Sequence, residues 1–183
     1  MTRQNKTSHI SARMRRPRTS GDDSSWAFVV LPKEASATLP RRGRTTIDGT
    51  INGAAFRALL EPDGQKSHWL RIDKELLQTA GVDFGDDACF EVTPVDREPE
   101  PEVPADLDVA LVASPESRAI WDSATTIARL DWIHWITSAK QEKTRTKRVN
   151  DACDMLAAGK KRVCCFDPSG FYSKAFSPPE TAD

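Results

Sequence analysis

The sequence is poor in the patterns that build metal sites and membrane spans. Its three histidines are scattered, and none of its four cysteines lies in a Cys-x-x-Cys pair, so no zinc-type ligand spacing is present. No apolar run approaches the roughly 18 residues of a membrane-spanning helix. The basic N-terminal stretch also has no apolar core of the kind that a secretory signal contains. We therefore expect a cytoplasmic protein that binds no metal and no other cofactor.

Net charge is also nearly absent, because 26 Lys and Arg balance 27 Asp and Glu to leave a formal charge of -1. No global field therefore selects a partner of one charge. The local balance is uneven: residues 1–20 and 140–162 are basic, whereas residues 96–108 are acidic. Runs of this kind are usually solvated faces or tails.

Sequence patterns that carry catalysis are missing as well. No glycine-rich loop has the spacing that cradles a phosphate. No nucleophile elbow is present that would set a serine beside a histidine and a carboxylate. The adjacent Asp86 and Asp87 are better explained as acceptors of turn hydrogen bonds. We expect no enzymatic activity.

The cysteines fit a reducing compartment. Cys89 falls in a strand pattern and Cys153 on the apolar face of a helix, so both are expected to be small buried residues. Cys164 and Cys165 are adjacent in sequence, and a disulfide between neighbours is strained and rare.

The first half of the chain has the pattern of a small β domain. Residues 1–24 are polar and basic without periodicity, and we expect a disordered arm there. Residues 25–96 contain short apolar strands separated by turn signals, which favours a small barrel or sandwich. Asn52 and Gly53 form the strongest hairpin signal, because both turn positions require positive φ. The expected elements are strands at 26–31, 45–51, 54–60, 68–72 and 88–95, and a helix at 74–80.

The second half has a helical pattern. Residues 97–104 alternate Pro and Glu and form an extended linker between domains. Residues 105–165 show helical periodicity, with Thr125 or Thr126 opening the third helix and Thr144 as the N-cap of the fourth. Residues 166–183 form an expected mobile tail. Strands followed by helices predict an α+β protein, an N-terminal barrel and then a bundle of three to four short helices.

The joint between the third and fourth expected helices is the best candidate site. It combines aromatic side chains with a cluster of basic residues at a helix junction. Two arginines three residues apart share a helix face and can grip an anionic group such as a phosphate, lipid head group or carboxylate. The same arginines could instead pair with nearby acids and hold the domains together. The candidate ligand-binding residues are Trp132, Trp135, Lys140, Lys143, Arg145 and Arg148.

The chain resembles a known pair of domains. The helical half resembles the YdeI/OmpD-associated family, described as bacteriocin-protection proteins, and the β half resembles the small barrel domain of unknown function often placed before it. In the helical half the resemblance rests on Pro104 to Leu107, Ala110-Leu111, Trp135-Ile136, Ala139-Lys140, Thr144-Arg145 and Arg148-Val149. In the β half it rests on Gly49 to Gly53, Phe56-Arg57, Ala80 to Asp86 and Val92 to Asp96.

The resemblance implies a role in tolerance of cationic antimicrobial peptides or envelope stress, and association with an outer-membrane porin. It implies no catalytic residues. For the β half it implies a barrel similar to the double-split β-barrels, which include DNA-binding domains of regulators and antitoxins. The basic arm and the Cys164-Cys165 pair lie outside the family pattern.

A nucleic-acid-binding regulator is the alternative. It would use the basic arm and the barrel, with a possible homodimer through the barrel, and its phosphate contacts would make binding weaken steeply with salt. The sequence lacks a helix-turn-helix, zinc or aromatic RNA-binding signature. The residues expected to contact nucleic acid are Arg13, Arg15, Arg16 and Arg18.

Overall fold

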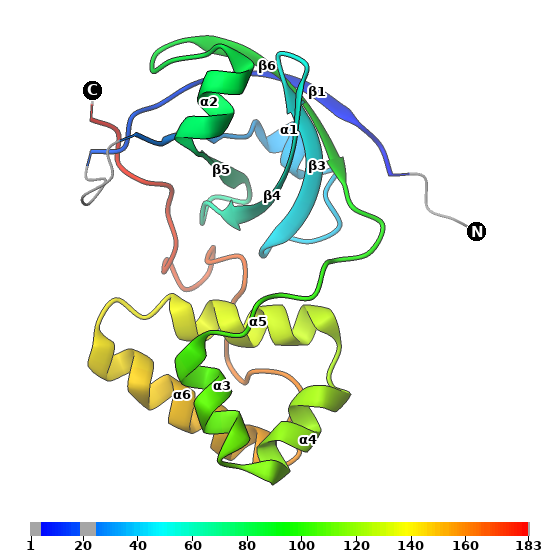
Figure 1. The fold of residues 1–183 in the computed structure, drawn as a ribbon, viewed down its shortest axis with the longest axis vertical. Coiled ribbons are helices and arrows are strands. Elements are labelled where there is room, and N and C mark those ends of the chain that lie inside the picture. Colours follow the sequence, from blue (N-terminus) through cyan, green and yellow to red (C-terminus); the bar gives the residue numbers. More distant parts are fainter. Residues whose placement is uncertain (1–4, 19–24, 183) are drawn as a thin grey trace. The chain divides into compact units, whose positions relative to one another are not determined.

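The structure is a computed structural model, and it describes residues 5–18 and 25–182. The chain divides into two compact units. One comprises residues 1–97 together with 169–183, and the other comprises residues 98–168. The α+β expectation is confirmed: the first unit contains an antiparallel sheet curled into a half-barrel, and the second is helical (Figure 1).

Six strands form the sheet of the first unit, in the order β1-β6-β3-β4-β5-β2. The described residues also include two short helices in this unit, α1 and α2. The bounds are β1 Ser8–Arg13, β2 Ala27–Val30, α1 Lys33–Ser36, β3 Thr45–Ile51, β4 Ala54–Pro62, β5 His68–Ile72, α2 Lys74–Ala80 and β6 Asp87–Pro94.

The hairpin predicted at Asn52-Gly53 joins β3 to β4. Both residues have positive φ, 47° and 87°, and Ile51 pairs with Ala54 across the turn. Alternation along the strands then sends one face of the sheet inward. The buried core of the half-barrel includes Val29, Ile47, Ile51, Leu60, Leu70, Ile72, Phe90 and Val92.

The first strand corrects the expected disordered arm. Residues 8–13 pair antiparallel with β6, from Ser8 opposite Val92 to Arg13 opposite Asp87. Only Ile10 and Ala12 on this strand are apolar and face the core, so the sequence has little β signal of its own and the pairing comes from β6. Residues 1–4 and 19–24 of the expected arm lie outside the described residues.

The two edge strands approach each other beyond the end of β1. Arg15 and Phe28 exchange two backbone hydrogen bonds, with N to O distances of 2.9 and 3.0 Å. This bridge starts to close the sheet, and Met14 beside it is buried in the core. The closed end leaves less edge available to other strands.

The C-terminal residues correct the expected mobile tail. The backbone N–H of Arg18 donates to the carbonyl oxygen of Glu180 at 2.7 Å, and that of Ala182 donates to Arg16 at 2.9 Å. The ammonium of Lys66 lies 4.5 Å from the centre of the Phe171 ring. Residues 169–182 therefore belong to the half-barrel unit, although their two prolines and low periodicity give no sign of it in the sequence.

The second unit contains four helices in the described chain. They are α3 Ala105–Val112, α4 Pro115–Ser123, α5 Thr126–Thr137 and α6 Glu142–Ala157. The Thr125 hydroxyl accepts a hydrogen bond from the Ala128 N–H at 3.1 Å, which makes Thr125 the N-cap of α5. The core of the unit is Leu107, Leu111, Trp121, Trp132, Ile133, Ile136, Val149, Ala152 and Leu156.

The last helix begins earlier than the sequence predicts. Gln141 takes the N-cap position with extended backbone, and the N–H of Arg145 donates to its carbonyl at 3.0 Å. Thr144 is therefore inside the first turn and is not the N-cap. The joint between α5 and α6 is consequently short, residues 138–141.

Candidate functional site

Arg148 closes the C-terminal end of α5. Its Nη1 donates to the carbonyl oxygen of Trp135 at 2.6 Å and to the hydroxyl of Ser138 at 3.2 Å. The guanidinium also lies 5.4 Å from the centre of the Trp135 ring. The last carbonyls of a helix have no partner within it and carry partial negative charge, so a cation there stabilises the helix end. Arg148 thus fixes the angle at which α5 meets α6.

Arg145 is held by an acid on another helix. Its Nε and Nη2 donate to the two carboxylate oxygens of Asp106, at 2.8 and 3.2 Å. These hydrogen bonds hold the pKa of Asp106 below its ordinary value and raise that of Arg145. The pair ties α6 to the first turn of α3, which is the structural role that the sequence left open for this arginine.

Of the two tryptophans predicted at the site, one is core. Trp132 is fully buried, and its indole N–H donates to the carbonyl oxygen of Lys161 at 3.0 Å. Trp135 is half-buried and packs edge-on against Trp132, with ring centres 6.2 Å apart. Only Trp135 can therefore offer an apolar wall to a ligand.

Lys140 and Lys143 flank the start of α6. Both side chains are exposed, and neither has a polar partner within residues 5–18 and 25–182. No side chain caps the first turn of this 16-residue helix, so its leading N–H groups remain open to a ligand. Glu142, in the same turn, places a carboxylate between the two lysines in sequence. We call Trp135, Lys140 and Lys143 the junction surface.

The arginines predicted to contact nucleic acid belong to the half-barrel. Arg13 pairs with Asp87, Arg18 with Glu180, and Arg16 lies over the Phe84 ring. Among the described residues, only Arg15 of the four has a side chain without a partner of this kind. The nucleic-acid alternative stays a prediction, and removing the arm would now also remove β1 from the sheet.

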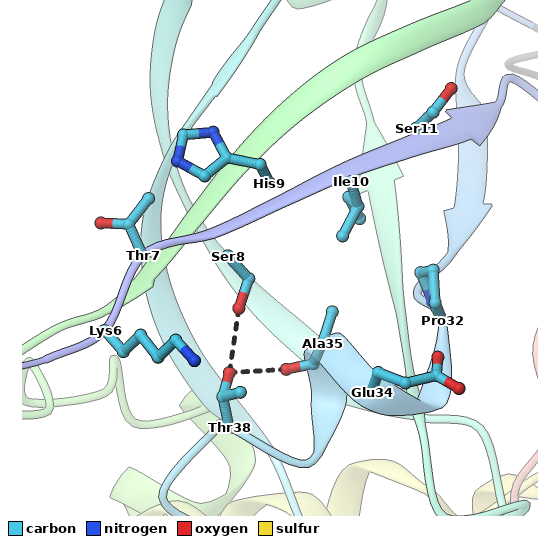
Figure 2. A pocket seen from close by; sticks show the side chains of 10 residues that line it. All are labelled: Lys6, Thr7, Ser8, His9, Ile10, Ser11, Pro32, Glu34, Ala35 and Thr38. Carbon is cyan, nitrogen blue, oxygen red and sulfur yellow. Dashed lines mark hydrogen bonds between the residues drawn. The ribbon is translucent and has the colours of Figure 1, made fainter.

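A pocket of about 560 Å³ lies between β1 and α1 of the half-barrel. Figure 2 shows Ser8 and Ile10 pointing from β1 toward α1, with Lys6 and Glu34 at the rim. The Ser8 and Thr38 hydroxyls are 3.2 Å apart, and Thr38 donates to the Ala35 carbonyl at 2.7 Å. The Ser8 and Thr38 hydroxyls thus bond within the protein, so they are not left free for a ligand. The sequence did not predict the pocket because it predicted neither β1 nor α1.

A second hollow, of about 710 Å³, lies on the outward face of β1, β3 and β6. Cys89 lines it and is exposed, which corrects the expectation of a buried cysteine. The misassignment arose because inward and outward positions alternate along β6, and Cys89 precedes the buried Phe90. His9 Nδ1 lies 3.5 Å from a carboxylate oxygen of Glu91 in the same hollow.

Neither a cluster of metal-ligating side chains nor a membrane-spanning helix is found among the described residues. Within residues 5–18 and 25–182, no three His, Cys, Asp or Glu side chains gather in a way that could hold a metal ion. Over the same residues, every helix is too short or too polar to cross a bilayer.

The fold and the site define a class of protein: a small β half-barrel followed by a compact helical domain that presents a basic joint. Comparison with family models agrees. Residues 11–92 match the family described as a domain of unknown function (DUF1905), and residues 100–159 match the bacteriocin-protection, YdeI or OmpD-associated family. The chain thus carries a DUF1905 domain followed by a YdeI/OmpD-associated domain, which confirms the resemblance. Among curated proteins, the comparison found no match.

Proposed function

We propose that the YdeI/OmpD-associated domain is a non-enzymatic binding module that captures an anionic group of a ligand or partner at the junction surface. We further propose that it acts in the cytoplasm and contributes to tolerance of antimicrobial peptides or envelope stress. The description of the matched family names bacteriocin protection, which supports the part of this proposal that concerns antimicrobial peptides. The observation that carries the binding proposal is the contrast between two sets of cations at one joint. Arg145 and Arg148 are bonded within the protein, whereas Lys140 and Lys143 are not.

This contrast distinguishes the arginines, which position the joint, from the lysines, which would bind the ligand. Replacing a partner of Arg145 or Arg148 would require a ligand to break hydrogen bonds of 2.6–2.8 Å that are already made. The lysines have no such bonds to break, and each ammonium offers three donors on a flexible stem. The arginines therefore support the proposal as residues that hold the joint in place, while the lysines and the first turn of α6 would meet the anion.

The expected affinity is modest. An exposed ion pair contributes about 0.2–1 kcal/mol, and a helix N-terminus contributes a similar amount at the surface. Two lysines and one helix start therefore contribute at most about 3 kcal/mol, which on its own is weaker than a millimolar dissociation constant. This magnitude favours an extended anionic partner that touches further residues, or an anionic surface, over a single free phosphate.

A thermal-shift screen of the full chain tests the proposal. The probes are inorganic phosphate, inositol hexakisphosphate, short duplex DNA, and vesicles of phosphatidylglycerol or phosphatidylcholine, each at low and moderate salt. A ligand that binds the folded state raises the unfolding temperature. We expect the polyanionic probes and the phosphatidylglycerol vesicles to raise the unfolding temperature and the phosphatidylcholine vesicles to leave it unchanged.

The matched control removes the same amount of charge at another position. Lys140→Gln/Lys143→Gln removes two charges at the junction surface, and Lys160→Gln/Lys161→Gln removes two exposed charges beyond the end of α6. Binding that falls only in the first variant supports the site. Equal losses in both variants would show a nonspecific response to net charge and would overturn it.

A further inference from the structure

The two adjacent cysteines form an exposed pair outside the matched family region. Cys164 and Cys165 follow α6, beyond residue 159 where the YdeI/OmpD-associated match ends. Both are free and exposed, and their Sγ atoms are 3.1 Å apart, with either thiol able to donate to the other. Neighbouring side chains in an extended chain point to opposite sides, so this proximity needs a particular backbone.

The backbone supplies that conformation at Cys165. Its φ is 60°, in the left-handed region that non-glycine residues seldom adopt. The two cysteines form a turn, and the turn brings the thiols to the same side. This conformation crowds the side chain of an L-residue against its own backbone, so the surrounding structure has to hold it.

Contacts on both sides of the turn hold the pair. Before it, the indole of buried Trp132 donates to the Lys161 carbonyl, and Val163 packs against the helical core. After it, the Phe166 ring meets the His134 ring edge-on, with centres 5.3 Å apart. The dithiol is therefore fixed to α5 at both flanks while its sulfur atoms face solvent.

A disulfide fits this arrangement poorly. Disulfides usually join Cα atoms about 4.4–6.8 Å apart, whereas Cα atoms of consecutive residues are only about 3.8 Å apart. A bridge between neighbours would therefore be strained and easily reduced. The hydrogen bond that the Cys165 thiol shares with Cys164 also holds the pKa of Cys165 above its ordinary value. A thiol that keeps its proton is slow in thiol–disulfide exchange, which requires the thiolate.

A zinc site fits poorly too. An atom bonded to both sulfurs at about 2.3 Å, the length of a zinc–thiolate bond, would see them at an angle of about 85° if they stayed 3.1 Å apart. Tetrahedral zinc needs a wider angle and four ligands, and no third His, Cys, Asp or Glu completes a site in the described residues. An angle near 90° suits a pyramidal trivalent centre with a lone pair.

We propose that Cys164 and Cys165 form a chelating dithiol for a trivalent thiophilic centre of the arsenite type. With phenylarsine oxide, two arsenic–sulfur bonds form while the arsenic–oxygen double bond and both S–H bonds break. The oxygen leaves as water with the two thiol protons, and arsenic stays trivalent throughout. No oxidant or reductant is needed, and the site does not use the junction surface.

The test is titration of the reduced full-length protein with phenylarsine oxide, followed by intact-mass measurement and peptide mapping. We expect one equivalent to bind at Cys164 and Cys165. Cys164→Ser and Cys165→Ser should each lower the affinity by about 100-fold or more, because each leaves only one sulfur and loses the chelate. Cys89→Ser, which removes another exposed thiol, should bind as the natural sequence does.

Two further arms test whether the fold builds the site. A dithiol competitor should remove the arsenical while an equal concentration of monothiol should not. A peptide of residues 160–168 contains the same two cysteines without their anchors, and it should bind about tenfold more weakly than the protein because it has to be ordered on binding. Serine variants that bind unchanged, an adduct on Cys89 or Cys153, removal by monothiol, or a peptide as tight as the protein would each overturn the proposal.

Discussion

Replacing His68 with leucine should destabilise the half-barrel more than the loss of any exposed contact. His68 is fully buried on β5, and its two ring nitrogens face two different segments. Nδ1 lies 2.6 Å from the hydroxyl of Ser36 on α1, and Nε2 lies 2.8 Å from the carbonyl oxygen of Gly43. A neutral ring that donates from Nε2 to Gly43 and accepts at Nδ1 from Ser36 satisfies both partners.

The magnitude follows from the groups that lose their partner. His68→Leu leaves the buried Gly43 carbonyl and the buried Ser36 hydroxyl unsatisfied, at about 1–3 kcal/mol each, and leucine recovers part of this by apolar burial. We expect a net loss of about 2–4 kcal/mol in the free energy of unfolding, or a fall of roughly 5–15 °C in the unfolding temperature. Ser36→Ala, which leaves only Nδ1 of His68 without a hydrogen-bond partner, should lower the free energy of unfolding by about half as much.

The pH dependence distinguishes this histidine from a generic core residue. Burial, the largest cause, lowers the pKa of His68 below the ordinary 6.5. The unfolded chain therefore takes up a proton first as pH falls. The stability contributed by neutral His68 is complete above about pH 6.5 and declines below it, by up to about 1.4 kcal/mol per pH unit, until the folded-state pKa is passed. His68→Leu should lose this component.

The assay is calorimetric unfolding of the natural sequence, His68→Leu and Ser36→Ala at several pH values between 5 and 8. The difference between the natural sequence and His68→Leu should shrink as pH falls below 6.5, because other acid-sensitive groups cancel in the comparison. A destabilisation below about 1 kcal/mol, or a difference that does not change with pH, would refute the reasoning.

Two other substitutions test the remaining contacts. Arg129→Met should lower the free energy of unfolding of the helical unit by about 1–2 kcal/mol, because Arg129 binds Glu100 and the carbonyls at the end of α4. Chemical denaturation measures this change. The Arg129 hydrogen bond lowers the pKa of Glu100, so the destabilisation should shrink as pH falls below about 4.5. Gly64→Ala should expose residues 169–182 to limited proteolysis because a Cβ there would collide with the Phe176 carbonyl, whereas Gly53→Ala, also at positive φ but in open space, should not.

Local signals in the sequence predicted much of this structure. Asn52 and Gly53 predicted the hairpin because their turn needs positive φ, and the bounds of β5 and α2 agree with the structure. The predictions for two segments were wrong for the same physical reason. The strand at 8–13 and the tail at 169–182 hold their places through distant partners, β6 and residues 16–18, and such pairings leave no periodicity in the segment itself.

The basic character of the helix joint was predicted from composition, but the contacts of its individual residues were not. A helix joint rich in Lys and Arg was evident from the sequence. Which of these cations are paired within the protein was not. Arg145 depends on Asp106, which lies 39 residues earlier, and Arg148 depends on the backbone of Trp135. Sequence spacing cannot show whether a given cation is already paired through the tertiary fold. The structure shows Arg145 and Arg148 bonded within the protein, and it gives the side chains of Lys140 and Lys143 no polar partner among the described residues.

The most direct measurement is the affinity of the full chain for the polyanionic probe that gives the largest thermal shift, compared between two charge-matched variants. The proposal predicts that Lys140→Gln/Lys143→Gln weakens binding by about tenfold, the equivalent of roughly 1.4 kcal/mol lost from two exposed contacts. Lys160→Gln/Lys161→Gln should change it by less than about twofold. Equal affinities for the two variants would contradict the assignment of the junction surface as the binding site.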